Sequence, residues 1–151
     1  MKIRNSFVAN SSSSSFIVID GDIQPTTLHV GQDIVVNDDF GTTEFGWGPE
    51  KIYDQESRII FAYLQALYLK RKNNIKLLEK VVIEHLGCRS IIWRITNDYV
   101  VSDRPGMTHG YIDHQSSAEE GNNIEMFDSE EALTKFLFGT KSYIQLDHDN
   151  Y

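Results

Sequence analysis

The apolar positions of the N-terminal third follow the spacing of β-strands. Residues 16–19 and 33–36 are short runs rich in β-branched side chains, which is typical of buried strands. Residues 27–30 predict a further strand, and Gly31 with Gln32 favours a two-residue hairpin turn that joins it to residues 33–36. This third of the chain is therefore expected to be β-structure.

Helical spacing replaces this pattern in the middle of the chain. Apolar residues recur every three or four positions over residues 59–67, and Asp54 is placed to cap the N-terminus of that helix. Residues 74–86 predict a second helix, which Gly87 would end in a left-handed conformation. The two helices are expected to form a helical hairpin, with the basic residues 70–72 at the end of the first helix.

Strand signals return after the second helix and again near the C-terminus. The expected strands cover residues 89–95, 99–101, 110–112 and 143–146. Between the last two, Asp128 and Glu131 have the spacing of a capping box, so we expect a short helix that runs to Phe138. The element order predicts one α+β domain over residues 1–151, with a helical hairpin and a short C-terminal helix packed on one face of a largely antiparallel sheet.

The chain is acidic, with a formal net charge of −8 at pH 7 and a pI of about 5.0. Such a field repels nucleic-acid phosphates and anionic membranes, so we expect no direct nucleic-acid binding and no membrane binding. The apolar stretch of the first helix is also too short to cross a bilayer. Lys70, Arg71 and Lys72 form a local basic cluster at its end.

Cys88 is the single cysteine, which excludes an intrachain disulfide and a cysteine-rich zinc site. A lone thiol fits a reducing compartment. Near the N-terminus, serines interrupt what would have to be the apolar segment of a secretory signal. We therefore expect a soluble cytoplasmic protein.

Residues 37–49 are rich in glycine and aspartate and predict a long loop, with a short strand at residues 42–45. Its aromatic residues Phe40, Phe45 and Trp47 form a candidate interaction surface. The alternative is a loop that folds over the core and buries these rings.

Imidazole and carboxylate side chains that suit a divalent metal occur at His109, Asp113, His114 and, near the C-terminus, His148. If residues 110–113 are extended, alternation places His109 and Asp113 on one face and His114 on the other. The other interpretation is a strand end whose polar residues hold a neighbouring loop by hydrogen bonds.

Five consecutive serines lie between two apolar segments near the N-terminus: Ser11, Ser12, Ser13, Ser14 and Ser15. We expect an ordered, hydrogen-bonded loop. A curled loop of this kind could bind an anion with its backbone amides, and a serine near Asp113 and His114 could act as a nucleophile. Phosphorylation of one of the serines is a third possibility.

A family resemblance rests on three segments. Asn10 with the five serines and Phe16 resembles the opening of an uncharacterised group of small bacterial and bacteriophage proteins. The other segments shared by that group are similar to residues 110–116, Gly-Tyr-Ile-Asp-His-Gln-Ser, and to the C-terminal residues 136–138, 142–144 and 149–150. The resemblance implies an origin but no activity.

The same three segments suggest one polar cluster, and hence a binding pocket. Its candidate members are Ser11, Ser12, Ser13, Ser14, Ser15, Asp113, His114, Gln115, Ser116, Asp149 and Asn150.

Two classes of function follow. In the first, the chain is a small accessory protein that binds a host or phage protein, in the host cytoplasm if a phage encodes it. In the second, the polar cluster binds or hydrolyses a nucleotide or another phosphate ester, with or without a metal. The sequence favours a protein partner and specifies neither a cofactor nor an oligomeric state.

Overall fold

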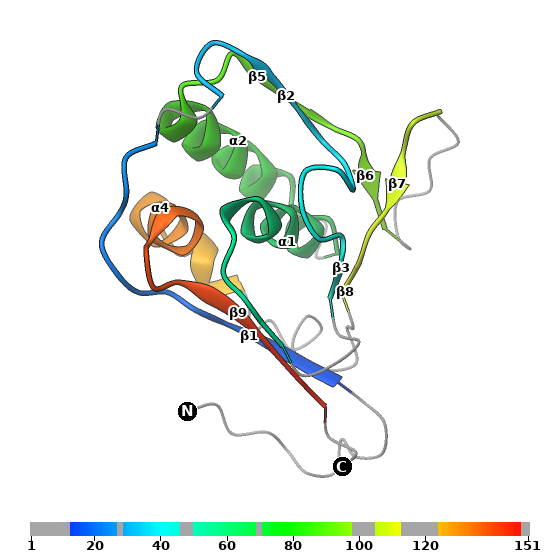
Figure 1. Cartoon of the computed structure of the whole chain (residues 1–151), viewed down its shortest axis with the longest axis vertical. Coiled ribbons are helices and arrows are strands. Elements are labelled where there is room, and N and C mark those ends of the chain that lie inside the picture. Colours follow the sequence, from blue (N-terminus) through cyan, green and yellow to red (C-terminus); the bar gives the residue numbers. More distant parts are fainter. Residues whose placement is uncertain are drawn as a thin grey trace.

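The computed structural model describes residues 13–26, 29–45, 50–68, 71–97, 105–112 and 124–148 (Figure 1). Its helices are α1 (Gln55–Tyr68), α2 (Lys72–Leu86), α4 (Glu130–Phe138) and the 3₁₀ helix η1 (Ile124–Phe127). Its strands are β1 (Ser13–Val18), β2 (Asp33–Val36), β3 (Glu44–Phe45), β4 (Glu50–Ile52), β5 (Ser90–Trp93), β6 (Ile95–Thr96), β7 (Thr108–His109), β8 (Tyr111–Ile112) and β9 (Tyr143–His148). The predicted mixed α+β fold is confirmed.

Antiparallel pairing is found in a three-stranded sheet with the order β1-β9-β4. Ile144 and Leu146 of the central strand β9 are buried, as are Ile17 of β1 and Ile52 of β4. Tyr143, at the alternate position, is only half-buried. One face of this sheet therefore belongs to the core, as expected for a strand with a period of two.

The remaining described strands form three separate parallel pairs, β2–β5, β3–β8 and β6–β7. In Figure 1 the helices lie between the β2–β5 pair and the three-stranded sheet. The sequence predicted one sheet with helices on one face, and the structure instead has β-structure on two sides of the helices. Between β2 and β5 the chain passes through α1 and α2, and such a helical crossover brings the next strand back in the same direction.

The helix ends follow the predicted chemistry at two of three positions. The Asp54 Oδ2 accepts a hydrogen bond from the Ser57 N–H at 3.0 Å, which caps α1. Gly87 ends α2 with a φ of 66°, in the left-handed conformation. The cap of α4 is Ser129, whose Oγ accepts from the Ala132 N–H at 3.0 Å, and the prediction of Asp128 was wrong by one residue.

The predicted hairpin between residues 27–30 and 33–36 is wrong. His29 and Gly31 have φ angles of 68° and 73°, so the chain turns there instead of extending. Strand β2 pairs with the distant β5. The predicted strand at residues 99–101 lies outside the described residues.

One cluster of buried apolar side chains contains residues from all three α-helices and from both kinds of β-structure. At its centre the Phe45 and Phe61 rings meet edge to face at 5.0 Å, and Phe136 lies 6.5 Å from Phe61. All three phenylalanines are fully buried. Among the described residues, no helix is long and apolar enough to span a membrane.

Candidate functional site

Three serines of the run are strand residues. The backbones of Ser13, Ser14 and Ser15 pair with those of His148, Asp147 and Leu146. The expectation of a loop is therefore wrong for these three, and so is an anion nest built on them, because a nest needs curled backbone. Residues 147–148 likewise belong to β9, which extends two residues beyond the predicted strand 143–146. The other proposed cluster members lie outside the described residues: Ser11, Ser12, Asp113, His114, Gln115, Ser116, Asp149 and Asn150.

Of the two described aromatic residues predicted to form an interaction surface, Phe45 does not contribute to such a surface. Phe45 is fully buried against Phe61, and Phe40 is half-buried against the core, with its ring 6.1 Å from that of His29. Trp47 lies outside the described residues. The alternative interpretation, a loop folded over the core, is correct for Phe45, since alternation within β3 turns this ring inward while Glu44 is exposed.

Among the metal candidates, His109 is exposed on β7. In the described ranges, no three His, Cys, Asp or Glu side chains come together as a metal-binding group. Asp113 and His114 lie outside these ranges, and only the backbone pairing of His148 is described.

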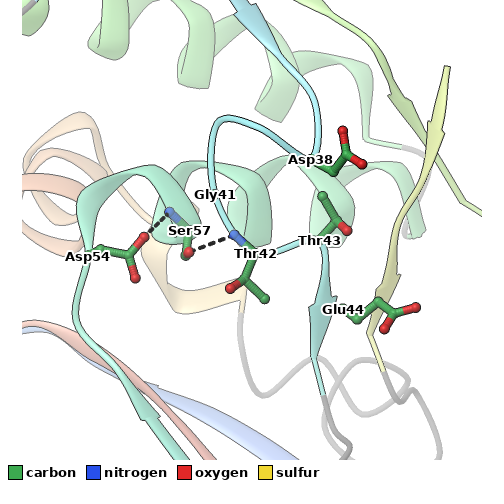
Figure 2. A pocket seen from close by; sticks show the side chains of 7 residues that line it. All are labelled: Asp38, Gly41, Thr42, Thr43, Glu44, Asp54 and Ser57. Atoms are coloured by element: carbon green, nitrogen blue, oxygen red, sulfur yellow. Dashed lines mark hydrogen bonds between the residues drawn. The ribbon is translucent and has the colours of Figure 1, made fainter. Parts of the chain in front are cut away.

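A polar, open pocket of about 560 Å³ lies where the loop after β2 meets the start of α1 (Figure 2). Its lining residues are Asp38, Gly41, Thr42, Thr43, Glu44, Asp54 and Ser57. Three of them are carboxylates, and none is basic. The charge of this lining favours a cationic group over an anion.

The hydrogen bonds in this pocket hold the loop to the helix. Asp54 accepts from the Ser57 N–H, and the Ser57 Oγ accepts from the Thr42 N–H at 2.9 Å (Figure 2). Gly41 lies so close to the helix that an added Cβ would be 2.8 Å from the Ser57 nitrogen. These contacts give the loop residues of this pocket a structural role.

A second pocket, of about 520 Å³, lies beside the N-terminus of α1. It is bordered by the segment 24–26, by the first turn of α1 with Tyr53 before it, and by the end of α4. Arg58 lines this pocket although only 4% of the residue is exposed. Tyr53 is 52% exposed, and its ring lies 5.1 Å from that of Tyr143.

Arg58 ties the start of α1 to the end of α4. Its Nη1 donates to the carbonyl oxygens of Phe136 at 2.7 Å and Gly139 at 3.0 Å. Its Nε is buried and has no hydrogen-bond partner in the described structure. Burial lowers the pKa of Arg58 to about 10, while Asp54 and Glu56 act in the opposite direction, so the guanidinium keeps its charge at neutral pH.

A third surface is the outer face of the β2–β5 pair. Asp33, Val35 and Ile92 are exposed, while Ile34 and Val36 are buried. Val35 and Ile92 are register partners in the parallel ladder, with exposures of 45% and 37%. We call the surface formed by Asp33, Val35, Ser90 and Ile92 the outer β2–β5 face.

The charge of Asp33 on this face is neutralised locally. The carboxylate accepts two hydrogen bonds from Arg89, at 2.8 and 2.6 Å, and one from the Ser90 hydroxyl at 2.7 Å. These hydrogen bonds hold the pKa of Asp33 well below its usual range. The face therefore combines exposed apolar side chains with a compensated ion pair.

Sequence reasoning missed Arg58 and the outer β2–β5 face. Arg58 stands directly before the apolar run of α1, and a cation at that position was a signal for a buried polar role. The alternation of Asp33 with Ile34 likewise assigned Val35 to the side opposite the core. Neither signal shows which groups from other parts of the fold face Arg58 or Val35.

The comparisons with known proteins add no relative. No protein-family model matches the chain, and neither a curated protein nor a solved structure matches it.

Proposed function

We propose that this chain is an accessory protein that acts by binding another protein, through its outer β2–β5 face. The observation that carries the proposal is the exposed register pair Val35 and Ile92 in a parallel ladder. Parallel strands occur almost only where both faces of the sheet are covered. Here one face packs on the helices and the other presents apolar side chains to solvent.

The inner side of this pair is firmly attached. The Trp93 ring stacks on Tyr63 with centroids 4.0 Å apart, and its Nε1 donates to Glu79 at 2.7 Å. Strand β5 is thus held to α1 and α2, so its opposite side is presented in a fixed orientation. A preorganised surface loses little conformational entropy on binding.

Charge decides what kind of partner fits. Two copies of a chain with a net charge of −8 repel each other, which disfavours self-association through this face. The ion pair of Asp33 and Arg89 leaves the apolar centre without net charge. We therefore propose a different protein, with an apolar patch surrounded by basic residues that complement the acidic chain.

The test compares Val35→Asp with the matched control Lys76→Asp, an exposed position on α2. Partners are captured from the native source on immobilised protein, identified, and purified for a binary binding measurement. Val35→Asp is expected to weaken binding about tenfold or more, since it places a charge in the apolar centre. Lys76→Asp should bind as the wild type does.

Two results would contradict this proposal. Equal affinity of the wild type and Val35→Asp for the purified partner would place the interface elsewhere. A dimer in sedimentation that dissociates on Val35→Asp would replace the foreign partner with a second copy of the chain. Circular dichroism of each variant checks that the fold is retained.

One observation favours the alternative of a small-molecule site. The β1–β9 register places the backbone of Ser13 opposite that of His148. A serine of the run therefore lies beside a residue that we named as a candidate metal ligand. Metal analysis and thermal melts with divalent metals or nucleotides, on the wild type and His148→Ala, test this alternative. Bound metal or ligand-dependent stabilisation that His148→Ala removes would support it, and neither effect would end it. An origin in the bacterial and phage group also remains part of the proposal.

A further inference from the structure

The pocket beside α1 contains a buried guanidinium with an unused donor. Arg58 uses Nη1 for the two carbonyl oxygens at the end of α4, while its Nε has no acceptor in the described structure. A buried donor without a partner costs about 1–3 kcal/mol, so such groups in a protein call for an explanation. The Nε side of a guanidinium is also one of the edges with which arginine grips planar oxyanions.

The surroundings of Arg58 are those of a ligand pocket. The volume of about 520 Å³ lies within the range of small-molecule sites. Gln24, Gln55 and Thr140 supply polar groups, and the first turn of α1 directs backbone N–H groups and a positive partial charge to the same place. Tyr53 supplies an exposed aromatic ring at the pocket, supported by Tyr143.

The charges of the pocket select among anions. Asp54 and Glu56 line it together with Arg58, so the site has one cation against two carboxylates. One oxygen of Asp54 already accepts from the Ser57 N–H. A doubly charged phosphate would meet more repulsion here than a singly charged group, and a planar carboxylate matches the guanidinium edge.

We infer that this pocket binds a carboxylate attached to an aromatic or apolar group. The carboxylate accepts from the Nε side of Arg58, and the apolar group lies on Tyr53. The Nε atom is itself covered by protein in this structure, so the proposed contact requires lining side chains to move apart. The site shares no residue with the outer β2–β5 face, so the inference stands apart from the proposed function.

A carboxylate of this kind has two sources, the C-terminus of a peptide and a free small acid. N-acetylphenylalanine represents the first source and phenylacetate the second, while N-acetylphenylalaninamide and phenylacetamide are their neutral controls. Inorganic phosphate serves as a further anion. The readout is the ¹⁵N–¹H signal of the Arg58 Nε in protein labelled on arginine, assigned by its loss in Arg58→Lys.

We expect the Nε signal to shift saturably with at least one carboxylate and to stay in place with the amides and with phosphate. The tighter of the two carboxylates identifies the source. Tyr53→Ala should weaken binding about threefold to tenfold, since it removes the stacking ring, whereas Val30→Ala, at another exposed apolar position, should leave affinity unchanged.

Three results would overturn the inference. They are a Nε signal that no carboxylate moves, an equal response to the carboxylates and their amides, and a response to phosphate alone. If Arg58→Lys, which loses the bonds to α4, folds poorly, the Nε signal is assigned by elimination, from lysine substitutions of the other arginines. In that case Tyr53→Ala is the variant that tests the site by mutation. The titrations themselves use the wild-type chain.

Discussion

The two kinds of β-structure in this molecule are covered to different extents. In the three-stranded antiparallel sheet, Ile144 and Leu146 of β9 are buried, and Tyr143 and Gln145 on the other side of the strand are half-buried. In the parallel β2–β5 pair, the inner side chains pack on the helices but Val35 and Ile92 remain exposed on the outer face. An antiparallel sheet commonly has one face on the core and one face in solvent. A parallel pair with one uncovered face is unusual.

Because of this difference, we expect the antiparallel sheet to contribute more to stability and the uncovered β2–β5 face to take part in recognition. A two-stranded ladder is marginal by itself, so the β2–β5 pair depends on Trp93 and the helices for its position. Buried residues of both the pair and the sheet belong to the central core, but the sheet around β9 has a third strand. We therefore expect the sheet to unfold only with the whole protein and the pair to open more easily.

The largest expected effect is in the antiparallel sheet. Ile144→Ala removes a fully buried side chain of β9 and should lower the free energy of unfolding by about 2–5 kcal/mol. The matched change Ile92→Ala, at a 37% exposed position of β5, should cost roughly 1 kcal/mol or less. Urea denaturation of both variants measures the difference. Equal losses would mean that the two regions are covered alike.

A smaller loss is expected at the corner where α4 leads into β9. The buried Ser142 Oγ accepts from the Asp20 N–H at 2.9 Å and lies 2.7 Å from the Lys135 carbonyl oxygen, to which it can donate. Ser142→Ala removes the acceptor of the Asp20 N–H, while the Lys135 carbonyl keeps its hydrogen bond from the Gly139 N–H. The change should cost about 1–3 kcal/mol in urea denaturation. Thr134→Ala, whose hydroxyl bonds an exposed carbonyl on the same helix, is the control and should change little.

Local opening of the parallel pair can be followed at Cys88, the single cysteine, which is buried just before β5. Burial raises the pKa of this thiol, so alkylation requires opening and deprotonation. With iodoacetamide at a constant pH, we expect a labelling rate that rises less steeply with urea than global unfolding does. A rate with the full urea dependence of global unfolding would show that the pair opens only with the whole protein.

The smallest effect concerns the ion pair on the outer β2–β5 face. The pKa of Asp33 is lowered in the folded protein, so its contribution to stability is present above the unfolded pKa, about 3.8, and is lost as the pH falls below it. Asp33→Asn should therefore be less stable than the wild type at neutral pH, and the gap should narrow in acid. Thermal melts over this pH range measure the gap. A gap that stays constant as the pH falls would exclude the ionised pair as its cause.

Local signals predicted much of the fold. The helices α1 and α2, the Asp54 cap and the Gly87 C-cap all follow from spacing and from single-residue chemistry, which act over a few positions. The predicted hairpin of residues 27–30 and 33–36 was wrong because a turn dipeptide does not show which strand lies beside β2. The candidate site was less predictable, since Phe45 lies in a glycine-rich loop by sequence and in the core by packing.

The serine run is a second case in which local sequence signals did not predict strand pairing. Its composition predicted a loop, but pairing with β9 makes Ser13–Ser15 part of a strand, because long-range backbone hydrogen bonds outweigh weak local preference.

The sequence by itself determined the helices, the caps at Asp54 and Gly87, the acidic charge and the presence of β-structure at both ends of the chain. These properties depend on neighbours along the chain, on backbone conformations open to each residue type, and on composition. Only the tertiary structure decided which strands pair, that Val35 and Ile92 meet on an uncovered face, and that Arg58 lies in a pocket with its Nε unpaired. Those features arise from contacts between residues far apart in sequence, and no local pattern contains them.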